Sequence, residues 1–170
     1  MSVQDIPQTI SVIPREFIIE SGSDRMLDAA KYVTPIVENT LPYGGDRYTI
    51  RGLQVSAEMI DGTILSGADG YSMSQSVYNM ERLEVIKGPN AILVPGGVMN
   101  PITKSPFLKN ASSVSLELSQ YSANAVSFDI NRVLGKAGKW PRLVYARRQT
   151  DYYMKGQYRN GYEIAPSFSY

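Results

Sequence analysis

The sequence predicts a small α+β domain followed by about four antiparallel β-strands. The 170 residues include 12 Tyr, 14 Gly and 10 Pro, and this composition is typical of strand-rich chains with many turns. Composition changes near Asn110: residues 1–110 have a net charge of −3, whereas residues 111–170 have a net charge of +4 and hold 10 of the 17 aromatic side chains. Alternation of apolar and polar residues begins only after this change. We therefore expect two parts with different folds.

Two short helices are predicted in the first part. Pro14 is expected to start a turn of helix over residues 15–18, which Gly22 ends. Ser23 is a suitable N-cap for a second helix, with Asp24 in its first turn. The second helix is predicted from apolar side chains at helical spacing and from the proline that ends it, namely Met26, Ala29, Ala30, Val33 and Pro35.

Short strands separated by turns complete the first part. Each predicted strand precedes turn residues: 48–51 before Gly52, 58–60 before the hairpin-type turn Asp61-Gly62, and 82–87 before Gly88-Pro89. The glycine-rich segment 88–97 lacks the Lys and Ser/Thr of a phosphate-binding loop, so we expect two tight turns there. A linker is predicted from the turn residues around the join, namely Pro101, Pro106, Lys109 and Asn110.

The second part alternates apolar and polar residues in successive strands. The predicted strands lie at residues 114–119, 126–131, 143–153 and 162–170, with turns at 122–124, 135–138 and 156–161. Alternation places one face of a strand in an apolar medium and the other in water. That medium is either the core of an ordinary antiparallel sheet, which is the commoner case, or lipid around a transmembrane β-barrel. Tyrosines near the strand ends favour the barrel.

The composition excludes several classes of chemistry. The chain contains no Cys and no His, which removes disulfides, thiolate nucleophiles, zinc sites built on these residues and any Ser-His-Asp triad. A net charge of +1 gives no overall field that would attract nucleic acid. Acidic pairs such as Glu81 and Glu84 are expected to be solvated, because nothing in the sequence brings a pair together across a sugar. We expect no enzymatic activity, no cofactor, no metal site and no nucleic-acid partner.

A series of segments, in this order and spacing, resembles the plug domain of TonB-dependent outer-membrane receptors, most of all the siderophore-receptor branch. The segments are residues 5–16, 27–35, 48–52, 60–62, 81–89 and 95–106. Each alone is a weak signal, and together they extend the resemblance over roughly residues 4–106. Residues 128–132 and 165–170 are similar, more loosely, to the first strands of the family's barrel.

The resemblance implies a plug domain at residues 1–106, a linker at 107–112 and the truncated start of a transmembrane β-barrel at 113–170. In this family a plug fills a 22-stranded barrel. The chain departs from the family pattern at Val94 and Ile36, and it shows neither a signal peptide nor the segment that TonB grips. Four strands cannot close a barrel, because open edges in lipid leave backbone groups unpaired. We therefore expect an N-terminal fragment of a receptor.

The resemblance also implies a function and a location. The intact receptor would bind a ferric siderophore or a similar scarce nutrient at the outer membrane of a Gram-negative cell. Its plug would gate uptake that TonB energises. The implied partners are the nutrient, TonB and outer-membrane lipid.

Specific residues carry these implied roles. Arg51 and Lys87 stand where plug cations of the family pair with barrel carboxylates, and we name this pair the plug–barrel lock. The signature positions of the plug are Gly52, Asp61, Gly62, Gly88, Pro89, Gly96, Gly97 and Asn100. Apical loops of the plug contact ligand in the family, which makes Tyr43, Glu58 and Tyr71 the candidates for ligand binding.

Two other function classes remain open from the sequence. The first is a free-standing periplasmic plug-like module that binds or signals without transport. The apolar alternation of residues 111–170 speaks against such a module, since it would leave an apolar face exposed. The second is a small enzyme such as a glycan hydrolase, which would need convergent acids that the sequence does not show.

Overall fold

The computed structural model describes residues 9–23, 25–32, 36–39, 47–55, 58–66, 76–87, 97–118, 124–134, 140–151 and 158–169. The chain divides into two compact units, Met1–Thr103 and Lys104–Tyr170.

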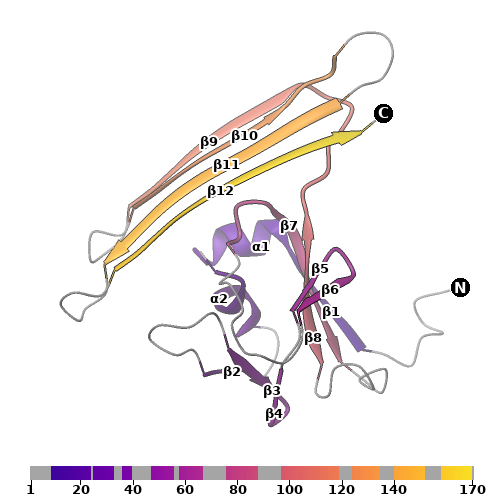
Figure 1. Cartoon of the computed structure of the whole chain (residues 1–170), viewed down its shortest axis with the longest axis vertical. Coiled ribbons are helices and arrows are strands. Elements are labelled where there is room, and N and C mark those ends of the chain that lie inside the picture. The colour runs from indigo at the N-terminus through magenta and orange to yellow at the C-terminus, as the bar shows by residue number, and fades with distance from the viewer. Residues whose placement is uncertain are drawn as a thin grey trace, which may run out of the picture. The chain divides into compact units, whose positions relative to one another are not determined.

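A three-stranded antiparallel sheet forms the centre of the first unit (Figure 1). Its order is β1 (Thr9–Pro14), β7 (Met80–Lys87) and β8 (Val98–Thr103). The strand predicted at 82–87 is therefore confirmed. Pro101, predicted in a linker, instead lies in β8 opposite Leu83, so that part of the prediction is wrong. A proline is tolerated there because β8 is the last strand of its sheet.

Two short helices follow β1 and precede the hairpins. The first, α1 (Arg15–Glu20), begins after Pro14 as predicted. It ends with the Gly22 N–H donating to the Ile19 carbonyl at 3.1 Å and the Ser23 N–H donating to the Ile18 carbonyl at 3.3 Å. This paired arrangement satisfies the last carbonyls of the helix.

The second helix, α2 (Met26–Ala30), begins later than predicted. Its N-cap is Arg25, and no side chain caps it. Ser23 lies two residues before this N-cap, and its hydroxyl bonds the Ser21 hydroxyl at 2.7 Å, at the end of the preceding helix. Asp24, Val33 and Pro35 lie outside the described residues.

Two tight hairpins complete the first unit. The first belongs to a three-stranded sheet of β2 (Ile36–Glu38), β3 (Tyr48–Ile50) and β4 (Leu53–Gln54), and the second joins β5 (Glu58–Ile60) to β6 (Thr63–Ser66). Both turns have two residues with positive φ: 53° and 79° at Arg51-Gly52, and 49° and 78° at Asp61-Gly62. These are the hairpin turns that match strand twist. The Asp61-Gly62 turn is confirmed, whereas Arg51, predicted at a strand end, lies in a turn.

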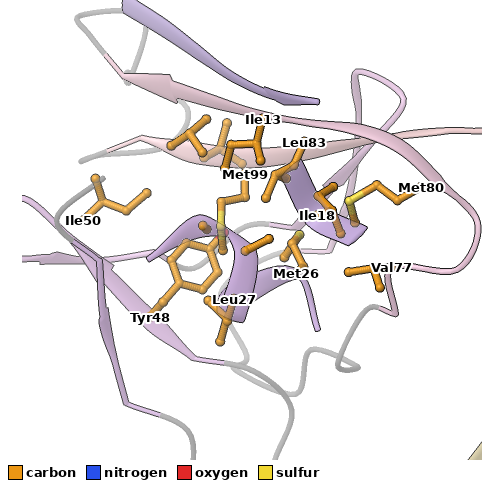
Figure 2. Close-up of a cluster of buried hydrophobic side chains, with 14 of the residues drawn as sticks. Ile13, Ile18, Met26, Leu27, Tyr48, Ile50, Val77, Met80, Leu83 and Met99 are labelled. Atoms are coloured by element: carbon orange, nitrogen blue, oxygen red, sulfur yellow. The ribbon is translucent and has the colours of Figure 1, made fainter. Parts of the chain in front are cut away.

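The core of the first unit lies between the β1–β7–β8 sheet and the two helices (Figure 2). Ile13 and Leu83 come from paired strands, and both are completely buried. Ile18 of α1 and Leu27 of α2 pack into the same cluster, as does Ile50 of β3. The small buried Ala29 and Ala30 of α2 belong to the predicted apolar stripe.

Four long antiparallel strands make up the second unit, paired in sequence order (Figure 1). They are β9 (Ala111–Leu118), β10 (Asn124–Asn131), β11 (Trp140–Asp151) and β12 (Tyr158–Ser169). The prediction of about four antiparallel strands is confirmed. The prediction of a turn at 156–161 is wrong for its last residues. These residues belong to β12, in which Gly161 pairs with Arg148. The predicted linker also ends earlier, because Ala111 already belongs to β9.

One face of the β9–β12 sheet carries large exposed apolar side chains. Phe128 of β10 pairs with Val114 and Tyr145 on the neighbouring strands, so these three side chains share a face. Phe128 and Ile130 are 38% and 39% exposed, and Leu116 and Phe168 reach 71% and 77%. Phe128 and Ile130 are thus not buried in a protein core. The commoner interpretation of the alternation, an ordinary antiparallel sheet, requires such burial.

Among the described residues, neither helix has the length or apolar character needed to cross a membrane.

Candidate functional site

Arg51 of the predicted lock lies at the tip of the β3–β4 hairpin. Its side chain is exposed, and its backbone has φ of 53°. Residues with side chains as large as arginine seldom occupy this left-handed region, where glycine, asparagine and aspartate are usual. The turn therefore presents a cation on a strained backbone, and such strain is often found at functional positions.

Lys87 is the last residue of β7 and is only 8% exposed. Alternation along β7 places it on the same face as Leu83 and Val85, which explains how a lysine comes to be buried. Its Nζ donates to the Ser11 Oγ at 3.2 Å. Burial lowers the pKa of the Lys87 ammonium below its ordinary value, and the nearby positive charge of Arg51 lowers the pKa further.

The charge of Arg51 thus acts on Lys87, although the two predicted lock residues belong to different sheets. Within the described ranges, neither Arg51 nor Lys87 forms a salt bridge with a carboxylate. A buried ammonium without a counter-charge is energetically unfavourable. Chemically, this pair of cations is suited to receive an anionic group.

Three predicted signature residues meet where the β5–β6 turn is attached to β8. The Asp61 N–H donates to the Pro101 carbonyl at 3.1 Å, and the Gly62 N–H donates to Asn100 Oδ1 at 2.9 Å. Asn100 is buried, and its Nδ2 donates to Glu84 Oε2 at 3.1 Å. The signature positions therefore hold the hairpin onto the central sheet.

Gly97, another signature residue, is required by its backbone and by its surroundings. Its φ is 126°, and an added Cβ would lie 2.6 Å from the carbonyl oxygen of Ile86. No side chain fits there without movement of the β7 backbone. Gly52 is needed for its turn, with φ of 79° and open space around it. Gly88, Pro89 and Gly96 lie outside the described residues.

The predicted ligand-binding residues are only partly represented. Glu58 begins β5 and pairs with Ser66 across the hairpin. Tyr43 and Tyr71 lie outside the described residues. The assignment of these three residues to ligand binding stays a prediction.

A buried charged cluster in the second unit was missed by sequence reasoning. Asp129 of β10 accepts hydrogen bonds from Lys104 Nζ at 2.7 Å and from Arg142 Nε and Nη2, each at 2.9 Å. Lys104 and Arg142 are 4% and 9% exposed. The available signal was polar alternation, which places Asp129 and Arg142 on the polar face of the strands. Because Asp129 and Arg142 are far apart in the sequence, their pairing was not predicted.

Residues 2–100 match the family model described as TonB-dependent Receptor Plug Domain. The match covers more than half of the chain, so this chain belongs to the TonB-dependent receptor plug domain family.

Relatives and solved structures extend the similarity beyond the plug. The catecholate siderophore receptor Fiu of Escherichia coli K12 is 29% identical over 99% of this chain and 23% of its own length. The metal-pseudopaline receptor CntO of Pseudomonas aeruginosa (strain UCBPP-PA14) is also 29% identical, over 99% of this chain and 24% of its own length. The chain spans about a quarter of the length of these relatives.

Two crystal structures share the fold. The closed form of the ferric-catecholate import receptor Fiu from E. coli K12 matches with a TM-score of 0.83 and 28% identity, over 98% of this chain and 24% of that one. The siderophore receptor PiuA from Acinetobacter baumannii matches with a TM-score of 0.81 and 24% identity, over 98% of this chain and 24% of that one. Both matches include the four-stranded second unit as well as the plug.

Proposed function

We propose that this chain supplies the plug and the first barrel strands of an outer-membrane receptor that takes up a ferric siderophore or a similar scarce nutrient in a TonB-dependent manner. One observation carries the proposal. A unit of the plug family is followed by a four-stranded sheet with an exposed apolar face, and siderophore receptors resemble both over nearly the whole chain. The division of the chain into two compact units, Met1–Thr103 and Lys104–Tyr170, supports a plug followed by barrel strands.

The proposed mechanism is gating without covalent chemistry. The cations of Arg51 and Lys87 pair with carboxylates of the barrel and hold the plug in place. Losing one partner of such a pair leaves a buried charge uncompensated at a cost of about 3–5 kcal/mol, so the pair acts as a lock. Force applied through TonB displaces the plug and opens the path for the nutrient.

The ligand is proposed from chemistry and from relatives together. Ferric siderophores are commonly anionic and rich in aromatic groups, which suits tyrosine and cationic side chains. Tyr43 and Tyr71 are therefore better candidates for ligand contact than Glu58. The relatives named for catecholate and pseudopaline ligands support a metal-chelating small molecule as the nutrient.

The free-standing periplasmic module is disfavoured by the second unit. An apolar face containing Leu116, Leu118 and Phe168, each more than 70% exposed, is unsuited to a domain surrounded by water. An apolar face of this kind is suited to contact with the lipid around a transmembrane β-barrel.

A hybrid receptor tests the proposal. The segment of E. coli Fiu that matches this chain is replaced by residues 1–170, and uptake of radiolabelled ferric catecholate is measured in iron-starved cells with and without TonB. We expect uptake that requires TonB. Absence of uptake by a hybrid that reaches the outer membrane and binds the ferric catecholate would contradict the proposed gating.

A further inference from the structure

Two consecutive residues at the boundary are held by different units of the chain. Thr103, the last residue of β8, donates its backbone N–H and its hydroxyl to the Asp61 carboxylate at 2.8 and 2.7 Å. Lys104, the first residue of the second unit, places its Nζ 2.7 Å from Asp129 Oδ2. Thr103 is thus bonded within the first unit, and Lys104 forms this ion pair within the second.

Residues 104–110, which we call the strap, lie between β8 and β9 and are bound by side chains of β10 and β11. The Arg142 guanidinium donates to the Ser105 carbonyl at 2.7 Å while it also binds Asp129. The same guanidinium lies 5.2 Å from the centre of the Phe107 ring. One arginine thus ties both the backbone and an aromatic side chain of the strap to the sheet.

Asn131 holds the middle of the strap. It is 1% exposed, and its Oδ1 accepts the Phe107 N–H at 3.1 Å. Its Nδ2 donates to the carbonyls of Phe107 and Lys109 at 2.7 and 2.6 Å. The side chain of Asn110 in turn accepts the Val133 N–H at 2.8 Å. These bonds satisfy backbone groups that a segment without regular secondary structure leaves unpaired.

The two attachments differ in strength. The Asp61–Thr103 contact is exposed, where water competes for the hydrogen bonds. The Lys104–Asp129–Arg142 cluster is mostly buried, and removing Asp129 would take the shared carboxylate away from two buried cations. We therefore expect the exposed contact to break before the buried cluster does.

We infer that the strap is a fixed anchor of the β9–β12 sheet and that the plug hinges at the Thr103–Lys104 peptide when it is displaced. Asp129 and Asn131 are positioning residues of this anchor. The part that this hinge plays in gating rests on the proposed function, whereas the attachment of the strap does not.

Hydrogen exchange of single amides in the full chain, held in detergent micelles, tests the inference. Urea is added until the Val85 amide in the plug core loses its protection. We expect the Phe107 amide to stay protected under that condition. Loss of Phe107 and Val85 protection at the same urea concentration would overturn the inference.

Variants link the protection to the anchor. Asn131→Ala is expected to speed exchange of the Phe107 amide about tenfold in the absence of urea, with Val85 unchanged. Asn160→Ala removes an exposed asparagine of β12 and serves as the control, with no change at Phe107. If Asn131→Ala prevents folding, Asp129→Asn gives a second readout, faster cleavage by trypsin after Lys104. Unchanged Phe107 exchange in Asn131→Ala, or unchanged cleavage in Asp129→Asn, contradicts the anchor.

These measurements need no transport. If the hybrid receptor takes up no nutrient, the inferred anchor is not contradicted. If the exchange measurements contradict the anchor, the proposed function is not contradicted.

Discussion

The carboxylate of Asp61 binds Thr103 with both of its oxygens, so a turn residue of the β5–β6 hairpin fixes the end of β8. Asp61 has φ of 49°, a conformation that glycine adopts freely and aspartate tolerates. The same residue therefore serves the turn and the tether at the plug boundary.

Asp61→Gly separates these two roles. Glycine keeps the left-handed turn but removes both hydrogen bonds to Thr103, so we expect the free energy of unfolding of the first unit to fall by about 1–3 kcal/mol. Urea denaturation of the full chain in micelles, followed at the Val85 amide, measures the change. Asp61→Asn retains one acceptor and should lose less. Equal stability of Asp61→Gly and the parent chain would show that the tether contributes nothing.

Gly97→Ala should be one of the most damaging small substitutions. The added Cβ would lie 2.6 Å from the Ile86 carbonyl oxygen, and φ of 126° is unfavourable for alanine. We expect a loss of about 2–4 kcal/mol, seen as a lower urea midpoint. Gly161→Ala is the matched control, because nothing lies within 4 Å of a Cβ at that position in β12. Similar midpoints for the two variants would contradict the packing argument.

The lowered pKa of Lys87 predicts that the stability of the plug depends on pH. Its pKa is lowered in the folded chain relative to the ordinary 10.5, so the unfolded chain binds more protons between the two values. Stability should therefore rise as pH increases through the folded pKa toward 10.5. Urea midpoints measured over this range should show the rise, and Lys87→Met should remove it. Lys31→Met, at a more exposed lysine, should keep it. An identical rise in Lys87→Met would assign the effect to other groups.

Arg51→Asn should stabilise the plug while impairing gating. Asparagine fits the left-handed turn position better than arginine, so we expect a gain of about 0.5–1 kcal/mol in the free energy of unfolding. In the hybrid receptor the barrel should at the same time hold the plug less firmly, because one cation of the plug–barrel lock is removed. Urea midpoints and passage of a small noncognate solute into cells check the two effects. A variant that is less stable than the parent would contradict the strain at Arg51.

Turns and strands could be predicted from the sequence where they are formed by residue types that are common at those positions. Asp61-Gly62 was predicted as a turn because Asp-Gly favours positive φ, whereas at Arg51-Gly52 only the glycine was predicted in the turn because arginine is unusual there. Pro101 was assigned to a linker because proline disfavours strands, although the last strand of a sheet accommodates it.

Contacts that join distant parts of the chain could not be predicted in the same way. Alternation placed Asp129 on the polar face of its strand, but nothing local indicated that Lys104 and Arg142 would reach it. The effect of the Arg51 charge on Lys87 likewise depends on how two sheets pack. Such pairings follow from tertiary packing, which the period of a single strand does not encode.

The central claim, that the β9–β12 sheet faces lipid on one side and the receptor interior on the other, is open to a direct measurement. Because the chain has no cysteine, Leu116→Cys and Ser115→Cys each introduce one attachment site for a spin label within it, on adjacent residues of β9, and any cysteine in the Fiu part is replaced by serine. In the hybrid receptor reconstituted in lipid vesicles, collisions with oxygen and with a water-soluble nickel chelate report the surroundings of each label. We expect oxygen-rich, nickel-poor exposure at position 116, where the label faces lipid, and the reverse at position 115. Equal access of the nickel chelate to both positions would contradict it.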